Sequence, residues 1–108
     1  MKESSLVRKI IAAIKKRYPH AYVRKLSDRY ARGVPDILVV IHCAAFVRGL
    51  NARHEWGGVL FIETKTQNGK LSKLQEHELS LVRANGAEAI IARDVDAVLA
   101  KLSEMGAV

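Results

Sequence analysis

The apolar run DILVVI at residues 36–41 is the feature that most constrains the fold of this chain. It is rich in β-branched residues and far shorter than the ~18 apolar residues of a membrane span, so it predicts a buried central strand. A second run, VLFI at 59–62, predicts another strand over residues 59–65. Two buried strands need other elements to cover them. The chain has 108 residues, of which 49% are hydrophobic, and this is enough for one packed domain.

Helical periodicity flanks these strands. Apolar residues recur at spacings of three and four within residues 3–18, and Pro19 ends that helix. The resulting order, α-β-β-β-α-β-α, predicts an α/β fold with a mixed four-stranded sheet flanked by helices. We expect one domain over residues 1–108. The remaining elements are strands at 21–26 and 87–92, helices at 72–85 and 94–103, and an inserted loop or arm at 42–57 that fits either a helical turn or a mobile loop.

Positive charge is concentrated in the first half of the chain. Residues 1–53 hold 12 Lys and Arg against 3 Asp and Glu, whereas residues 54–108 hold 6 against 8. This asymmetry favours a polyanionic partner such as nucleic acid, although solubility alone is the simpler explanation.

Cysteine usage and the first residues of the chain bear on its location. The single cysteine, Cys43, excludes an internal disulfide and predicts a reducing, cytoplasmic environment. The opening MKESSLVRK lacks the apolar core of a signal peptide, and no run is long enough to span a membrane. We therefore expect a cytoplasmic protein without a membrane partner.

Two carboxylates and a lysine lie at predicted strand ends. Glu63 and Lys65 are two residues apart on one strand, so they project to the same side of the sheet. A surface ion pair explains that spacing, but Asp36 begins the other apolar strand. If the two strands are neighbours, Asp36 and Glu63 meet at one sheet end. A hard cation such as Mg²⁺ would relieve their repulsion, and Lys65 would stabilise phosphate charge.

Glu3 and Gln75 are further candidates, each with a structural alternative. Glu3 precedes Leu6 by three residues and falls on the apolar stripe of the first helix, which predicts burial. It equally suits the first turn of a helix, where the dipole favours an acid. Gln75 follows Ser72 by three residues, a capping box, yet it also lies on the inward stripe of its helix.

Basic residues bracket the proposed carboxylate site. Any single one is most simply a solvated surface charge, but together they suit a phosphodiester substrate. The predicted nucleic-acid-binding residues are Arg24, Lys25, Arg29, Arg32, Lys70 and Lys73.

Three short motifs in order resemble a known family. GVPD at 33–36, IETK at 62–65 and LSKLQ at 71–75 are similar to the VRR-NUC domain, a branch of the PD-(D/E)xK nuclease superfamily. The resemblance covers nearly the whole chain and implies the same α-β-β-β-α-β-α fold. It is closest to the stand-alone phage and bacterial members, which act as homodimers on branched DNA such as Holliday junctions, with each subunit nicking one strand.

The resemblance also implies roles for individual residues. Asp36 and Glu63 would bind Mg²⁺, with Mn²⁺ as a substitute and the backbone carbonyl of Thr64 as a further ligand. Lys65 would be the catalytic lysine and Gln75 the helix glutamine of the family. Glu3 would supply the acidic residue of the first helix and contribute to the metal site.

The hypothesis is therefore a metal-dependent, structure-selective DNA endonuclease. The alternative from another class is a non-catalytic nucleic-acid-binding module of the same fold, which the basic half alone would serve. A third possibility is a small oligomerisation domain that uses residues 42–57 as its interface. Paired carboxylates inside a basic surface favour the enzyme, because they repel phosphates and give a pure binding protein no advantage.

Overall fold

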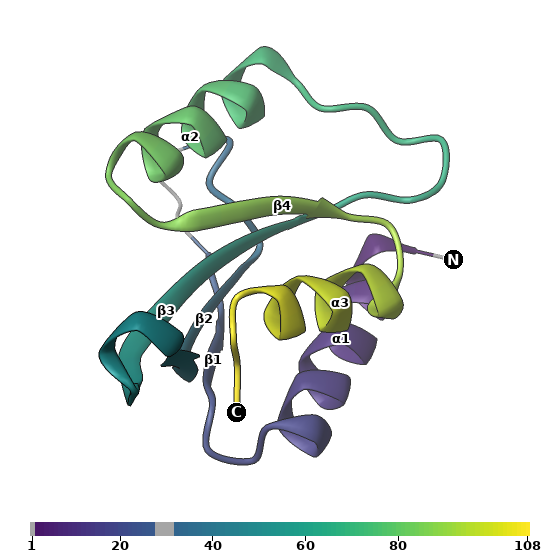
Figure 1. Ribbon diagram of the computed structural model, residues 1–108. Coiled ribbons are helices and arrows are strands. Elements are labelled where there is room, and N and C mark those ends of the chain that lie inside the picture. The colour runs from purple at the N-terminus through teal and green to yellow at the C-terminus, as the bar shows by residue number, and fades with distance from the viewer. Residues whose placement is uncertain (1, 28–31) are drawn as a thin grey trace.

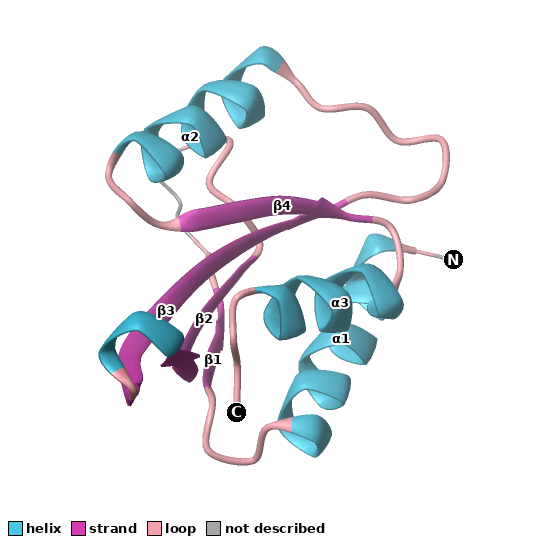
Figure 2. Ribbon diagram, in the orientation of Figure 1, coloured by secondary structure: helices cyan, strands magenta, loops and turns pink. Residues whose placement is uncertain are grey.

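The computed structural model describes residues 2–27 and 32–108, and its elements follow the predicted order (Figure 1). One short 3-10 helix, η1, is added between the second and third strands (Figure 2). The elements are α1 (Glu3–Arg17), β1 (Tyr22–Lys25), β2 (Ile37–Val47), η1 (Arg48–Leu50), β3 (Ala52–Thr64), α2 (Lys73–Ala84), β4 (Glu88–Ala92) and α3 (Val95–Glu104).

The four strands form one mixed sheet in the order β1-β2-β3-β4. β1 pairs with β2 and β2 with β3 in antiparallel fashion, whereas β3 and β4 are parallel. The parallel pair is connected through α2, because parallel neighbours need a crossover longer than a hairpin turn. The predicted α/β fold with a mixed four-stranded sheet is confirmed.

The main core lies between the sheet and the helices α1 and α3. These two helices lie together on one side of the sheet, and α2 lies on the other side next to β4 (Figure 1). No helix among the described residues is both long and apolar enough to cross a membrane. The largest fully buried side chains of this core include Ile10 and Ile14 of α1, Ile37 and Val39 of β2, Leu60 and Ile62 of β3, and Leu102 of α3.

The segment at 42–57 is a β-hairpin; a helical turn is present only at its tip, as η1, and the paired strands on either side of it were not predicted from the sequence. The β2–β3 ladder continues without interruption from the pair Ile37–Ile62 to the pair Val47–Ala52. The regular burial of alternate β2 residues ends at Cys43, so beyond it the strand has no apolar pattern and only the backbone ladder continues. We call residues 42–57 the arm.

Gly58, at the base of the arm, permits close packing and does not interrupt the strand. A Cβ atom there would lie 2.7 Å from the sulfur of Cys43, which is fully buried on the paired strand. At the other end of the arm, Asn51 closes the hairpin with a left-handed φ of 47°, a conformation that asparagine tolerates better than most residues.

Candidate active site

The β2–β3 pairing brings Asp36 and Glu63 to the same end of the sheet. Ile37 pairs with Ile62, and the Asp36 N–H donates to the Ile62 carbonyl at 2.9 Å. Both isoleucines point into the core, and neighbouring residues along a strand point to opposite faces. Glu63 therefore lies on the face where α2 begins, and Asp36, one residue before β2, lies at the same end of the sheet. The condition on which the sequence-based hypothesis depended, that these two strands are neighbours, is met.

Thr64 holds one oxygen of the Asp36 carboxylate through two hydrogen bonds. Its backbone N–H donates to Asp36 Oδ2 at 2.8 Å, and its hydroxyl donates to the same oxygen at 2.6 Å. Thr64 is fully buried, so its hydroxyl needs a buried acceptor. The sequence-based interpretation concerned only the Thr64 carbonyl and missed the side chain. The sequence signal that could have revealed this role is a hydroxyl side chain on the core-facing side of a buried strand.

Glu63 is almost completely buried, with an exposed fraction of 2%. Its Oε1 accepts a hydrogen bond from Gln75 Nε2 at 3.0 Å, and its Oε2 is buried with no partner among the described residues. Burial above all, and then the negative charge of Asp36, raise the pKa of Glu63 from 4.5 to about 7, against the opposing effect of Lys65. The carboxylate is thus poorly compensated by its own surroundings.

Lys65 lies one residue beyond β3 and reaches back over the strand end. Its Nζ is 4.0 Å from Glu63 Oε1 and 3.9 Å from Glu3 Oε1. The Lys65 side chain is only 12% exposed, so its charge is partly desolvated. The predicted same-side placement of Glu63 and Lys65 agrees with this geometry.

Glu3 reaches the site but is not buried. The sequence placed it on the apolar stripe of α1, whereas its side chain is 51% exposed. Glu3 is the first residue of α1, and the core contacts of that helix begin one turn later at Leu6. The periodicity correctly predicted the direction of the Glu3 side chain. The part of the protein that covers the apolar stripe of α1 does not extend as far as Glu3.

Gln75 connects the start of α2 to Glu63. Its backbone N–H donates to the Ser72 hydroxyl at 3.1 Å, and its Oε1 accepts from the Ser72 N–H at 2.9 Å. The predicted capping box is therefore present. Because Oε1 is used by the cap, Nε2 is the end of the amide that donates to Glu63. The structural role and the site role of Gln75 coexist.

Gly33 lets the GVPD loop approach α2 closely. It has a φ of +81°, which a residue with a side chain rarely adopts, and a Cβ there would lie 2.9 Å from the backbone carbon of Leu74. The loop before Asp36 is therefore packed against the first turn of α2, close to Gln75.

Four predicted basic residues lie in the segments that lead to the carboxylates. Lys25 ends β1, and the next residue, Leu26, donates its N–H to the Asp36 carbonyl at 2.7 Å. Arg32 immediately precedes Gly33, Lys70 lies in the loop before α2, and Lys73 begins α2; all four side chains are exposed.

Arg24 and Arg29 differ from these four. The Arg24 guanidinium lies 4.1 Å from the ring centre of Tyr22 and donates to the Val23 carbonyl at 2.8 Å. It is thus already engaged within β1. Arg29 falls outside the described residues.

The carboxylate pair fits the divalent cation that the resemblance implies. The unpartnered Oε2 of Glu63 requires a counter-charge or donor, and carboxylate oxygens are the ligands that Mg²⁺ prefers. Within residues 2–27 and 32–108, no three His, Cys, Asp or Glu side chains are grouped closely enough to hold a metal ion. A cation here would need further oxygens from backbone, water or substrate, as Mg²⁺ commonly does.

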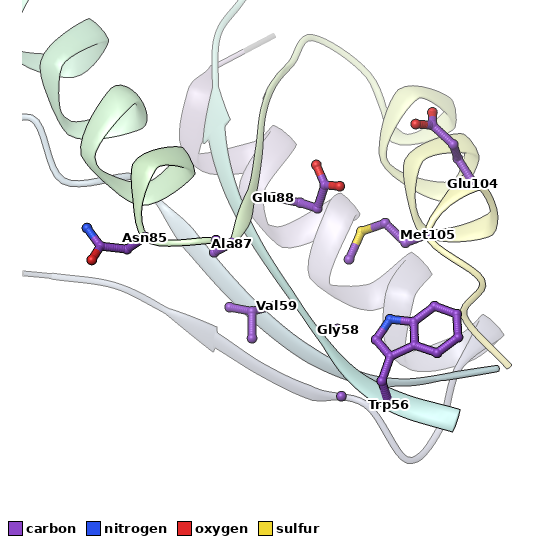
Figure 3. A pocket seen from close by; sticks show the side chains of 10 residues that line it. Trp56, Gly58, Val59, Asn85, Ala87, Glu88, Glu104 and Met105 are labelled. Carbon is purple, nitrogen blue, oxygen red and sulfur yellow. The ribbon is translucent and has the colours of Figure 1, made fainter. Parts of the chain in front are cut away.

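A cavity of about 610 Å³ lies away from this site, where the arm joins the sheet (Figure 3). It contains none of the predicted site residues, so its size does not bear on the carboxylate cluster. Its lining includes Trp56, Gly58, Asn85, Glu88, Glu104 and Met105.

No family model and no curated protein sequence matches the chain. Several solved structures are similar to it. One, described as a VRR_NUC domain, is 27% identical with a TM-score of 0.60, and the match covers 90% of this chain and 92% of that one. Another, a VRR_NUC domain protein, is 15% identical with a TM-score of 0.72 over 97% and 88% of the two chains, and supports the fold alone. Together with the fold, the first of these likenesses supports the assignment of the chain as a VRR-NUC domain, and hence as a nuclease-type domain.

Proposed function

We propose that the chain is a divalent-metal-dependent endonuclease that hydrolyses phosphodiester bonds in DNA. The observation that carries the proposal is Glu63, a buried carboxylate close to Asp36 and 4.0 Å from Lys65, with one oxygen that has no partner among residues 2–27 and 32–108. Burying a carboxylate without full compensation opposes folding. Strongly perturbed acids with a specific charged partner are typical of catalytic sites.

Asp36, Glu63 and the backbone carbonyl of Thr64 would hold Mg²⁺, or Mn²⁺ in its place, and Glu3 would add a more distant negative charge. When bound, the cation neutralises the carboxylate pair and stabilises the charge that develops on the phosphate. The hydrogen bonds from Thr64 and Gln75 fix the direction of the two carboxylates, so little rearrangement is needed on binding.

Lys65 would act on the phosphodiester itself. Its ammonium group is held near Glu3 and Glu63, where it can stabilise negative charge on the phosphate oxygens and orient the attacking water. The water oxygen forms a bond to phosphorus while the bond from phosphorus to the 3′ oxygen breaks. One water proton is released and the leaving oxygen gains a proton, which gives a 5′-phosphate and a 3′-hydroxyl.

The substrate would approach across the basic segments that lead to the carboxylates. Lys25, Arg32, Lys70 and Lys73 are all exposed and would contact the phosphate backbone. On the resemblance, we extend the proposal to branched DNA cut by a homodimer, with one strand nicked by each copy, as in Holliday-junction resolution.

Substitution of Asp36 tests the proposal. In Mg²⁺, Asp36→Ala should lose cleavage of flap and four-way DNA by more than about 100-fold, because the pair that binds the cation is broken. Asp96→Ala removes an exposed aspartate in α3 and should cut as the wild type does. Circular dichroism checks that both variants are folded. Undiminished cleavage by Asp36→Ala would contradict the proposal, and DNA binding without cleavage by the wild type in Mg²⁺ and Mn²⁺ would favour the non-catalytic binding module.

A further inference from the structure

The Lys65 side chain packs against a turn that follows it directly in the chain. We call residues 66–69 the Lys65 turn; it closes with a hydrogen bond from the Gly69 N–H to the Thr66 carbonyl at 3.0 Å. A Cβ atom added at Gly69 would lie 3.4 Å from Lys65 Cδ. The aliphatic part of Lys65 is therefore next to the turn, and the whole side chain is only 12% exposed.

This contact matters because the carboxylates near Lys65 do not fix its direction. Its Nζ lies 3.9 Å from Glu3 Oε1 and 4.0 Å from Glu63 Oε1, and both distances exceed those of hydrogen bonds. The two carboxylates attract the ammonium group, but a charge at this distance leaves a flexible four-carbon side chain free to turn. The Lys65 turn supplies a steric constraint that the ion pairs do not.

Arg93 holds the Lys65 turn from the neighbouring strand. It directly follows β4, whose last residue, Ala92, accepts a hydrogen bond from the Lys65 N–H at 3.0 Å. The Arg93 Nη1 donates to three carbonyl oxygens of the turn, those of Thr66, Gln67 and Gly69. The bond to Gly69 is 2.8 Å long and the bond to Gln67 is 3.3 Å long. Hydrogen bonds from a charged donor are about twice as strong as neutral ones.

The charge of Arg93 is used by this turn. Within residues 2–27 and 32–108, no salt bridge joins Arg93 to a carboxylate. The side chain is half-buried, so its guanidinium needs acceptors within the protein, and the turn carbonyls provide them. The loop after β3 and the end of β4 are thereby joined next to Lys65.

We propose that Arg93 is a positioning residue for Lys65. It holds the Lys65 turn against the aliphatic part of Lys65, and this contact keeps the ammonium group near Glu63. The inference rests on the proposed function, in which Lys65 stabilises charge on the phosphate, and deepens it by naming the residue that keeps Lys65 in place. A displacement of about 1 Å in a catalytic group can cost on the order of 100-fold in rate.

The first measurement follows Lys65 without DNA or metal. The protein is treated briefly with sulfo-N-hydroxysuccinimide acetate, and peptide mass spectrometry compares the acetylation rates of Lys65 and Lys101. Lys101 is the internal reference, because its side chain is 17% exposed and pairs with Glu88 at the other end of β4. Arg93→Met removes the donors and keeps a side chain of similar length. It should raise the Lys65 rate about threefold, because the turn opens more often.

Arg83→Met is the matched control. Arg83 also donates from its guanidinium to a backbone carbonyl, that of Ala89 at 2.9 Å, but it lies in the last turn of α2. Arg83→Met should leave the acetylation rate of Lys65 and the cleavage rate as in the wild type.

The second measurement is a double-mutant cycle on cleavage of flap DNA in Mg²⁺. Arg93→Met should lower the single-turnover rate at saturating DNA about tenfold and leave the half-saturating DNA concentration within about twofold of wild type. In Lys65→Ala protein the same substitution should change the rate less than about twofold, because the group through which Arg93 acts is already absent. An arginine that only stabilised the fold would lower the rate equally in both backgrounds.

Gly69→Val tests the same contact without altering Arg93. Gly69 does not have a positive φ, and an added side chain would press on Lys65 Cδ. This variant should raise Lys65 acetylation and lower cleavage as Arg93→Met does, and it decides by the same two criteria if circular dichroism shows that Arg93→Met is unfolded.

The proposal for Arg93 is overturned if Lys65 is acetylated no faster in Arg93→Met than in Arg83→Met. It is also overturned if Arg93→Met costs the same in the Lys65 and Lys65→Ala backgrounds. A wild type that does not cut DNA would contradict the proposed function instead, and the acetylation rates would still report on Arg93.

Discussion

Each central carboxylate is held by a donor from a different part of the fold. Asp36 accepts from Thr64 at the end of β3, and Glu63 accepts from Gln75 in the first turn of α2. Only one oxygen of each carboxylate takes part in these bonds. The direction of the carboxylate pair therefore depends on the packing of three elements, and conservative substitutions of the two donors should change function more than fold.

Thr64→Val removes the hydroxyl donor and retains most of the shape of the side chain. Because a bond to a charged acceptor is lost, we expect the free energy of unfolding to fall by about 1–3 kcal/mol. With Asp36 less firmly oriented, Mg²⁺ affinity measured by calorimetry should fall about tenfold. Thr64→Ser retains the hydroxyl and should bind Mg²⁺ nearly as the wild type does. Equal Mg²⁺ affinity for valine and wild type would show that the hydroxyl does not position Asp36.

Glu63 should make the metal-free protein less stable as the pH rises. Its pKa is raised from 4.5 to about 7 in the folded chain, mainly by burial. Between these values the unfolded chain releases the proton while the folded chain retains it, so unfolding becomes easier with increasing pH. The loss should total roughly 3 kcal/mol and level off above pH 7.

Urea unfolding from pH 4 to 8 without metal measures this effect. Glu63→Gln lacks the ionisable group and should lose the pH-dependent fall, whereas Glu76→Gln, an exposed substitution in α2, should retain it. Added Mg²⁺ should restore stability to the wild type at pH 8. If Glu63→Gln and wild type show the same pH dependence, Glu63 is not the destabilising group.

Sequence predicts well the site residues that lie at the ends of elements. Glu63 and Lys65 lie at the end of one apolar strand, so strand periodicity alone predicts that they share a side, and Asp36 immediately precedes the other. The distances between these side chains depend on the register of β2 against β3, which the apolar pattern of a single strand does not determine. The exposure of Glu3 was mispredicted because periodicity gives the direction of a side chain and not the extent of the layer above it.

At the scale of elements, the first turn of α2 acts both as a cap and as a support for the site. The cap and the support of the site depend on different groups of Ser72. The Ser72 hydroxyl accepts from Gln75, whereas the Gln75 amide is oriented by the backbone N–H of Ser72, which any residue at position 72 except proline would supply.

Two substitutions in α2 should therefore have different effects. Ser72→Ala should lower the free energy of unfolding by about 1 kcal/mol and leave cleavage within about twofold of wild type, since only the cap is lost. Gln75→Leu should cost similar stability but reduce cleavage more than about tenfold, because Glu63 loses its donor. Urea unfolding and initial cleavage rates measure both. Equal cleavage by the two variants would assign Gln75 to the cap alone.

The arm shows why an element can escape prediction from sequence. Beyond Cys43 its strands are largely exposed on both faces, so no alternation of apolar residues marks them, and the glycine pair at 57–58 resembles a break. The ladder is set by backbone hydrogen bonds that extend from the buried part of β2 and β3. By contrast, β4 and α3 were predicted nearly to their bounds because each presents one apolar face.

At the scale of the whole molecule, the β2–β3 hairpin spans from the carboxylates to the tip of the arm. The ladder has ten steps between the pairs Ile37–Ile62 and Val47–Ala52, or about 34 Å. The molecule is correspondingly elongated, at 45 × 29 × 23 Å. The arm tip is therefore too distant to take part in chemistry at its own site. Its exposed Phe46 and Leu50 would instead contact DNA or a second copy in the proposed dimer.

Cleavage of labelled four-way junction, flap and blunt duplex by wild type and Lys65→Ala tests the central claim most directly. The proposed nuclease predicts cuts by the wild type in Mg²⁺ or Mn²⁺ and none in EDTA. It also predicts at least a 100-fold loss in folded Lys65→Ala, on the order expected when a charge-stabilising group is removed. Symmetric cuts across the junction would support the dimeric resolvase. Cleavage that persists in EDTA, or that is equal in Lys65→Ala, would contradict the assignment of Asp36, Glu63 and Lys65 as the active site.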